Sequence, residues 1–143
     1  MFLYKDNRFH FSNISFCLSD NVYLNTTCEE YEDCIELHPV DADFRIIIYG
    51  EYSKEGAKRF FSKGEENCYC CISEVETVTF GGLSGYALSF NSSHNAYAEY
   101  RFDVHGDKNN IFGILIYASM PTEIKEVVKH PTVECLLQSL KIE

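Results

Sequence analysis

The sequence predicts an α+β fold in which a mainly antiparallel sheet carries a helix on each side, forming an α/β/α sandwich. Strand-like segments follow one another without alternating helices, which argues against a parallel α/β order. One of these segments is apolar on both faces and therefore needs cover on both sides. Two amphipathic helical segments are available as that cover. The 143 residues suit a single domain, 1–143, with one core.

The amino-terminal part reads as a series of strands. Residues 8–18, RFHFSNISFCL, alternate large apolar and polar side chains around Ser12-Asn13, which predicts a β-hairpin. A short strand, VYL, follows at 22–24, and an acidic loop leads into CIELHPV. FRIIIYGEY at 44–52 has apolar residues at both parities, which predicts a strand buried on both faces.

The first covering helix is expected directly after that strand. Ser53 is a suitable N-cap and Gly64 a suitable stop. Between them, Ala57, Phe60 and Phe61 fall at i, i+3 and i+4 and form one apolar stripe.

The second half predicts a four-strand meander followed by a second covering helix. The strands are ISEVETVTF, GYALSF, AYAEYRFDV and IFGILIYAS, separated by glycine-rich or polar turns. The tail PTEIKEVVKH places apolar residues on one helical face, and Pro131 interrupts it before TVECLLQSL continues the pattern.

The charge of the chain limits its partners. Twelve Lys and Arg against 22 Asp and Glu give a net charge of -10. Such a field repels phosphate backbones and anionic headgroups, so we expect neither nucleic acid nor a membrane as partner. No apolar stretch approaches the ~20 residues that span a bilayer, and the first residues do not resemble a signal peptide. We therefore expect a cytoplasmic protein.

Seven cysteines are an odd number for a disulfide framework. The chain is long enough to fold without disulfides, so we expect free thiols in a reducing compartment. Cys68, Cys70 and Cys71 are the weak candidates for a metal site, but they lack the C-x-x-C spacing of zinc sites and redox loops. We expect no metal and no cofactor.

One strand offers a candidate binding surface. In AYAEYRFDVH, Ala98, Tyr100, Phe102 and Val104 face one way. The opposite row alternates in charge and has an aromatic and a histidine at its ends: Tyr97, Glu99, Arg101, Asp103 and His105. An ordinary solvated sheet face with weak ion pairs would show the same pattern. We keep this row as the candidate for recognition of a partner.

No catalytic residue is predicted. The five histidines are scattered, and the G-x-S-x-G nucleophile motif is absent. The acidic loops lack the glycine and terminal glutamate of a calcium loop, and GGLSG lacks the lysine and following helix of a phosphate loop.

The pattern of elements resembles the PsbP-like fold, which is shared by the photosystem extrinsic protein of that name, Ran-binding import factors of the Mog family and uncharacterised bacterial domains. The resemblance covers nearly the whole chain. It rests on FHFSNISFCLSDN, FRIIIYGEYSKEGAKRFF, TFGGLSGYALSF with the two strands after it, and the closing ECLLQSLKI. It implies a non-enzymatic binding or assembly protein and transfers no site residue.

We therefore expect a non-enzymatic binding or assembly module that acts on a protein partner. The alternative is a small-ligand-binding protein or enzyme with a pocket between helix and sheet, as in cystatin-like cones. A structural subunit would instead show a large apolar patch and a stable oligomer. The sequence specifies neither the partner nor the oligomeric state.

Overall fold

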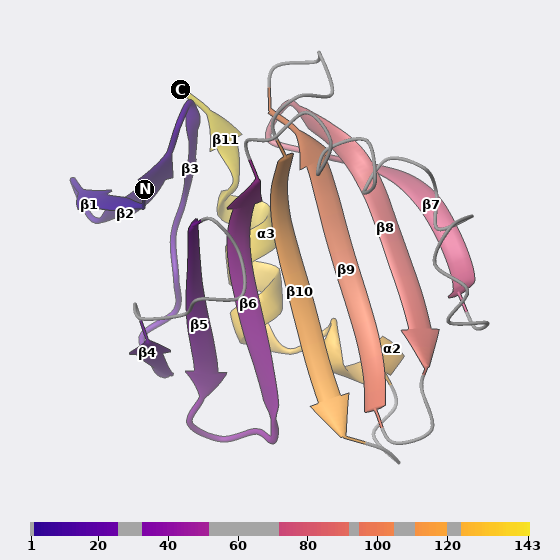
Figure 1. Cartoon of the computed structure of the whole chain (residues 1–143). Coiled ribbons are helices and arrows are strands. Elements are labelled where there is room, and N and C mark those ends of the chain that lie inside the picture. The colour runs from indigo at the N-terminus through magenta and orange to yellow at the C-terminus, as the bar shows by residue number, and fades with distance from the viewer. Residues whose placement is uncertain (1, 26–32, 52–71, 92–94, 105–110, 120–123) are drawn as a thin grey trace.

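The computed structural model describes residues 2–25, 33–51, 72–91, 95–104, 111–119 and 124–143. These residues form two antiparallel sheets and two short helices (Figure 1). Neither of these two helices has the length and apolar character that crossing a membrane requires.

The larger sheet has seven strands, all antiparallel. Their order across the sheet is β4 (Val22–Asn25), β5 (Asp33–Pro39), β6 (Phe44–Glu51), β10 (Ile111–Ser119), β9 (Asn95–Asp103), β8 (Leu83–Asn91) and β7 (Ile72–Phe80). The predicted meander β7 to β10 is confirmed, since consecutive strands pair as hairpins. It joins the amino-terminal strands through β6 and β10, where Ile48 lies opposite Ile114.

The smaller sheet contains the amino-terminal strands and the end of the chain. Its order is β1 (Leu3–Lys5), β2 (Arg8–Phe11), β3 (Ile14–Phe16) and β11 (Lys141–Ile142). The predicted hairpin around Ser12-Asn13 is confirmed. β1 adds a strand through a two-residue turn in which Asp6 and Asn7 have φ of 55° and 63°. Both values lie in the left-handed region that tight hairpin turns need and that Asp and Asn tolerate.

The two helices are α2 (Ile124–Val127) and α3 (Pro131–Ser139). Pro131 stands in the first turn of α3, where a missing amide hydrogen costs nothing. Before it, His130 caps the helix, because its Nδ1 accepts a hydrogen bond from the Thr132 amide at 3.2 Å. The interruption expected at this proline is therefore present, and it divides the carboxy-terminal segment into two helices.

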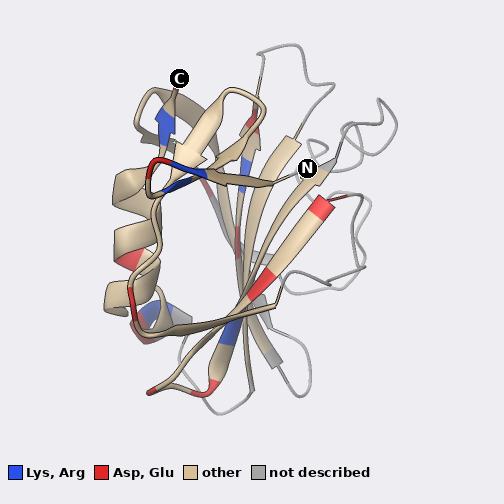
Figure 2. Cartoon of the chain, turned by 90° about the vertical axis from the view of Figure 1, so that its left-hand side faces the viewer, with Lys and Arg blue, Asp and Glu red and all other residues tan. Residues whose placement is uncertain are grey.

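Both helices bury apolar residues in the same core. Val127 of α2 and Val133, Leu136 and Leu137 of α3 belong to one buried cluster with the strands of both sheets. Seen from the side, α3 and the smaller sheet lie on one side of the seven-stranded sheet (Figure 2).

The predicted α/β/α sandwich, with a helix on each side of one sheet, is therefore wrong. The chain is mostly antiparallel β, arranged in two sheets, and its two described helices share one side. The physical reason lies in the first hairpin. It pairs with β11 rather than with the main sheet, and it lies with α3 on one side of that sheet, so a second sheet forms there in place of one continuous sheet (Figure 2). The helix predicted from Ser53 to Gly64 lies outside the described residues.

Strand β6 is buried on both faces, as predicted. Phe44, Ile46 and Ile48 enter the main core, whereas Ile47 and Tyr49 belong to a second buried cluster with Cys34 and Ile111. The seven-stranded sheet therefore has buried apolar side chains on both of its faces.

Phe11 and Gly50 join the two sheets. Phe11 of β2 is fully buried, and a Cβ placed on Gly50 of β6 would lie 2.1 Å from its Cζ atom. Only glycine at position 50 allows the ring to rest directly on the backbone of β6. This contact sets how closely the small sheet approaches the large one.

Candidate functional site

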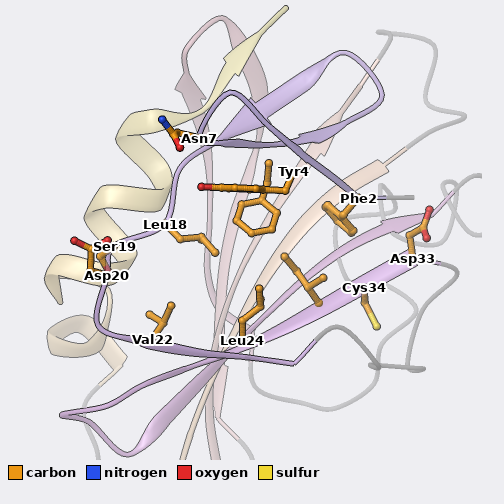
Figure 3. Close-up of a pocket in the computed structure, with 12 residues that line it drawn as sticks. Phe2, Tyr4, Asn7, Leu18, Ser19, Asp20, Val22, Leu24, Asp33 and Cys34 are labelled. Carbon is orange, nitrogen blue, oxygen red and sulfur yellow. The ribbon is translucent and has the colours of Figure 1, made fainter.

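A groove with a volume of about 680 Å³ lies between the two sheets (Figure 3). It is bounded by β1 and β2 on one side, by β4 and β5 on the other, and by the segment that joins β3 to β4. Twelve residues line it: Phe2, Tyr4, Asn7, Phe9, Leu18, Ser19, Asp20, Val22, Leu24, Asp33, Cys34 and Ile35.

One wall of the groove is aromatic. Tyr4 and Phe9 face each other across β1 and β2, with ring centroids 4.8 Å apart. Phe2 contacts Phe11 of the core at 5.1 Å, and Phe9 stacks on Phe16 at 5.6 Å. This wall is therefore continuous with the core and is held in place by it, while Tyr4 itself stays 64% exposed.

The opposite wall is aliphatic. Val22 and Leu24 point to the same side of β4 because side chains alternate along a strand, and Tyr23 points to the other side. In Figure 3, Leu18, Val22 and Leu24 extend into the space that Tyr4 and Phe2 border. Leu24 is 43% exposed, so part of this apolar surface is open to a ligand.

The polar side chains stand at the ends of the groove. Ser19 and Asp20 lie at one end and Asp33 at the other (Figure 3). Ser19 Oγ donates to Thr132 Oγ1 at 3.1 Å, which ties this end of the groove to α3. Among the described residues, the lining contains two aspartates and no Lys, Arg or His. An anionic group would therefore be repelled, and a neutral or cationic group would be accepted.

The candidate row of β9 lies elsewhere, on the far face of the seven-stranded sheet. The predicted alternation of this strand is confirmed: Ala98, Phe102 and Val104 are buried in the main core. On the other face, Glu99 and Arg101 are only 3% and 5% exposed. The row is therefore not the continuous solvated surface expected from the sequence. Tyr97 and Asp103 are partly buried, and His105 lies outside the described residues.

Glu99 and Arg101 form a buried hydrogen-bonded network with Tyr49. Arg101 Nε donates to Glu99 Oε1 at 2.8 Å, and Tyr49 Oη donates to Glu99 Oε2 at 3.0 Å. The tyrosine reaches across β10 because Gly113 leaves room for it, since a Cβ there would lie 2.0 Å from Tyr49 Cζ. Paired and hydrogen-bonded in this way, the two charges tolerate burial.

Farther along the same face, charged and aromatic side chains form a partly exposed ladder. Tyr97 and Tyr117 meet edge to face with centroids 4.5 Å apart, and the Arg45 guanidinium lies 4.5 Å from the Tyr117 ring centroid. Arg45 Nη1 donates to Glu36 Oε1 at 2.8 Å. This hydrogen bond lowers the pKa of Glu36 despite the opposing effect of burial.

The three cysteines of the described residues divide into two kinds. Cys17 and Cys135 are free thiols, but Cys34 is disulfide-bonded, so the expectation of free thiols throughout is wrong at this position. The weak metal candidates Cys68, Cys70 and Cys71 lie outside the described residues. Within the residues that are described, no three His, Cys, Asp or Glu side chains gather to hold a metal ion.

The groove was not predicted, because its walls come from strands that the sequence does not show to be neighbours. One signal was present in residues 2–11. FLYKDNRFHF has apolar residues on both sides of Asp6-Asn7, which is a hairpin pattern. Recognising it would have placed Tyr4 opposite Phe9, but not opposite Leu24.

No protein-family model matches the chain, and no curated protein matches it. Among solved structures, it is similar to a protein of Bacteroides thetaiotaomicron VPI-5482, with a TM-score of 0.51 and 12% sequence identity. The match covers 92% of this chain and 45% of the other, so this chain spans less than half the length of that protein. At such low identity the likeness concerns the fold alone. The resemblance to the PsbP-like group stays a prediction.

Proposed function

We propose that this protein is a non-enzymatic binding protein that holds a small amphipathic ligand, neutral or cationic, in the groove between its two sheets. The observation that carries the proposal is the groove itself, about 680 Å³ in volume. Ligand sites are typically concave, mostly apolar and roughly 300–1,000 Å³ in size. Binding of a ligand between the two sheets is therefore favoured over recognition of a partner by the candidate row of β9.

The lining indicates the class of ligand. Apolar contact with Phe2, Tyr4, Phe9 and the aliphatic wall would supply most of the free energy, at about 25 cal/mol per Å² of apolar surface buried. The carboxylate of Asp20 at one end selects against anions such as fatty-acid carboxylates. A molecule with an aromatic or aliphatic body and an uncharged or basic end group fits both features.

The disulfide at Cys34 bears on the compartment. Stable disulfides persist in oxidising environments and are rare in the cytosol. This bond therefore supports an oxidising compartment over the cytoplasm expected from the cysteine count.

Binding of Nile red, a neutral apolar dye whose fluorescence rises in apolar surroundings, tests the proposal. We expect saturable binding by the full chain and weaker binding of an anionic naphthalene sulfonate dye. Leu24→Asp places a charge in the aliphatic wall and should weaken Nile red binding about tenfold or more, the cost of losing one buried leucine contact.

Tyr23→Asp is the matched control. It lies beside Leu24 on the same strand, is 69% exposed and does not line the groove. We expect it to bind the dye as the unaltered chain does. Equal loss in both variants, or no saturable binding by the unaltered chain, would contradict a ligand site in the groove.

A protein partner is the second candidate, and the sheet edges favour it. β1 and β4 are the outer strands of their sheets and flank the groove. They expose Leu3, Tyr4, Tyr23 and Leu24 at 58%, 64%, 69% and 43%. An extended apolar segment of another protein could pair with either edge through its backbone.

A synthetic peptide of alternating apolar and polar residues distinguishes the two candidates. If the site takes a polypeptide, the peptide should slow amide hydrogen exchange in β1 or β4, and an N-methylated copy should not. If both peptides displace Nile red and neither slows amide hydrogen exchange in β1 or β4, pairing with a polypeptide is excluded and ligand binding in the groove is supported.

A further inference from the structure

The segment after β3 runs along one face of helix α3. The Cys17 amide donates to Ser139 Oγ at 2.8 Å, and Ser139 Oγ also donates to the Cys17 carbonyl at 3.2 Å. Two residues later, Ser19 Oγ donates to Thr132 Oγ1 at 3.1 Å. Ser139 and Thr132 lie two helical turns apart on the same face, so residues 17–19 follow that face in the direction opposite to the helix.

Cys135 lies on the same face between these two contacts. It is one turn, about 6 Å along the axis, before Ser139 and three residues after Thr132. Both Cys135 and Cys17 are free and partly exposed. Two reduced thiols therefore line the same seam between the segment and the helix.

The two thiols have different surroundings. Arg8 Nη1 donates to Cys17 Sγ at 3.0 Å. The guanidinium is held there by Ser15 Oγ, which accepts from Arg8 Nε at 2.9 Å, and by the Ser139 carbonyl. Arg8 is thus placed to neutralise a negative charge on the Cys17 sulfur.

No basic side chain within the described part of the chain donates to Cys135. Burial raises the pKa of this thiol, and the negative charges of a Cys17 thiolate and of Asp20 raise it further. Deprotonation of Cys135 is therefore disfavoured, whereas the Arg8 guanidinium lies directly against the Cys17 sulfur.

We propose that Cys17 and Cys135 are a redox-active pair that closes reversibly into a disulfide, with a low-molecular-weight disulfide such as oxidised glutathione as the oxidant. The Cys17 thiolate attacks one glutathione sulfur and releases the other as a thiolate, which takes up a proton. Cys135 then loses its proton to solvent and attacks the Cys17 sulfur. The second glutathione leaves as a thiol, so two protein thiols are oxidised and one glutathione disulfide is reduced.

Cys17 and Cys135 do not line the ligand groove, but Leu18, Ser19 and Asp20 line it directly after Cys17. A disulfide between Cys17 and Cys135 would link the segment that contains these three residues covalently to α3.

Oxidation of the full chain by glutathione disulfide tests the pair. After incubation, the remaining thiols are blocked with a maleimide, and the peptides are mapped by mass spectrometry without reduction. We expect a cross-linked peptide joining Cys17 to Cys135 that disappears after treatment with reduced glutathione. Separate glutathione adducts on the two cysteines without a cross-link, or two thiols that stay unmodified, would overturn the proposal.

Single serine variants test the order of the steps. Cys135→Ser should accumulate glutathione on Cys17, whereas Cys17→Ser should leave Cys135 reacting about tenfold more slowly than Cys17. Equal rates at the two positions would contradict the assigned roles.

The role of Arg8 is tested by comparing Arg8→Lys with Arg8→Gln. We expect the lysine variant to keep most of the rate at Cys17 and the glutamine variant to lose about tenfold. Circular dichroism of each variant shows that the chain is folded, and an equal rate in both variants would exclude an electrostatic role for Arg8.

Discussion

Glu99 and Arg101 show how a charged pair can occupy the inner part of a sheet face. Their spacing of two residues puts both side chains on one face of β9, where they meet each other and Tyr49. The pair is 4% and 7% exposed at its side chains. Each of the two charges therefore needs the other to offset its loss of solvation, which is not so for the charges of an exposed ion pair.

Replacing Arg101 with methionine should destabilise the protein by about 3–5 kcal/mol, because Glu99 would keep a buried charge without its partner. Replacing both residues with methionine should recover much of that loss, since apolar side chains of similar volume often substitute for a buried pair. Urea unfolding measures the three free energies. A double variant less stable than Arg101→Met would contradict this account.

Glu36 makes the free energy of unfolding depend on pH in the acid range. Its hydrogen bond from Arg45 lowers its pKa from 4.5, so the folded state holds the charged form more firmly than the unfolded state does. This contribution is present above pH 4.5 and is lost as the pH falls through the lowered value. The stability difference between the unaltered chain and Glu36→Gln should therefore stay constant above pH 4.5 and shrink as the pH falls below it.

The control for this acid dependence is Glu126→Gln. Glu126 and Lys129 form an ion pair at 3.7 Å with both side chains mostly exposed. Such an exposed pair contributes little to the free energy of unfolding. Its removal should therefore leave the loss of stability at acid pH nearly unchanged. An equal change in both variants would show that general charge, and not the Arg45 contact, sets the acid dependence.

At the scale of elements, glycines leave room for aromatic rings on both faces of β6, and one of these contacts joins the two sheets. Phe11 of β2 rests on Gly50 of β6, while Tyr49 of the same strand crosses Gly113 of β10. Gly50 thus contacts an aromatic ring on one face of β6. The residue before it, Tyr49, extends its own ring from the opposite face. Packing on both faces of one strand links the small sheet, the core and the buried charge network.

Gly50→Ala should destabilise the protein by about 1–3 kcal/mol, because the added methyl group would overlap the Phe11 ring and force it to move. Phe11→Leu removes the outer ring atoms and should make the alanine tolerable. In a double-mutant cycle measured by thermal unfolding, the loss in the double variant should be smaller than the sum of the single losses by about 1 kcal/mol. Additive losses would show that the two residues do not meet.

The turn at Ser12-Asn13 and the helix break at Pro131 are local features that the sequence indicated correctly. Pro131 ends one helix and starts the next as expected, and Ser12-Asn13 turns the first predicted hairpin. Both are local features set by a fixed φ or by a side chain that accepts left-handed backbone. The length of α2, by contrast, was overestimated, since only Ile124–Val127 is helical within the described residues.

At the scale of the whole molecule, binding in the groove should stabilise the fold. A ligand that binds only the folded state adds about 2.7 kcal/mol of stability when its concentration is 100 times its dissociation constant. We expect Nile red, or a soluble neutral amphiphile that displaces it, to raise the unfolding temperature of the unaltered chain and of Tyr23→Asp. Leu24→Asp should show little of this shift, and a rise of equal size in all three proteins would argue against the groove.

The sequence alone determined the local features of this protein: strand periodicity, the meander, the helix break at Pro131 and the two-sided burial of β6. These follow from nearest neighbours along the chain, because side-chain alternation and backbone dihedral preferences act within a few residues. Only the tertiary structure decided that β3 pairs with β11, that Glu99 and Arg101 are buried, and that Tyr4 faces Leu24 across a groove. Those outcomes depend on which distant segments pair and pack together, and that choice is a balance of many small free energies spread over the whole chain.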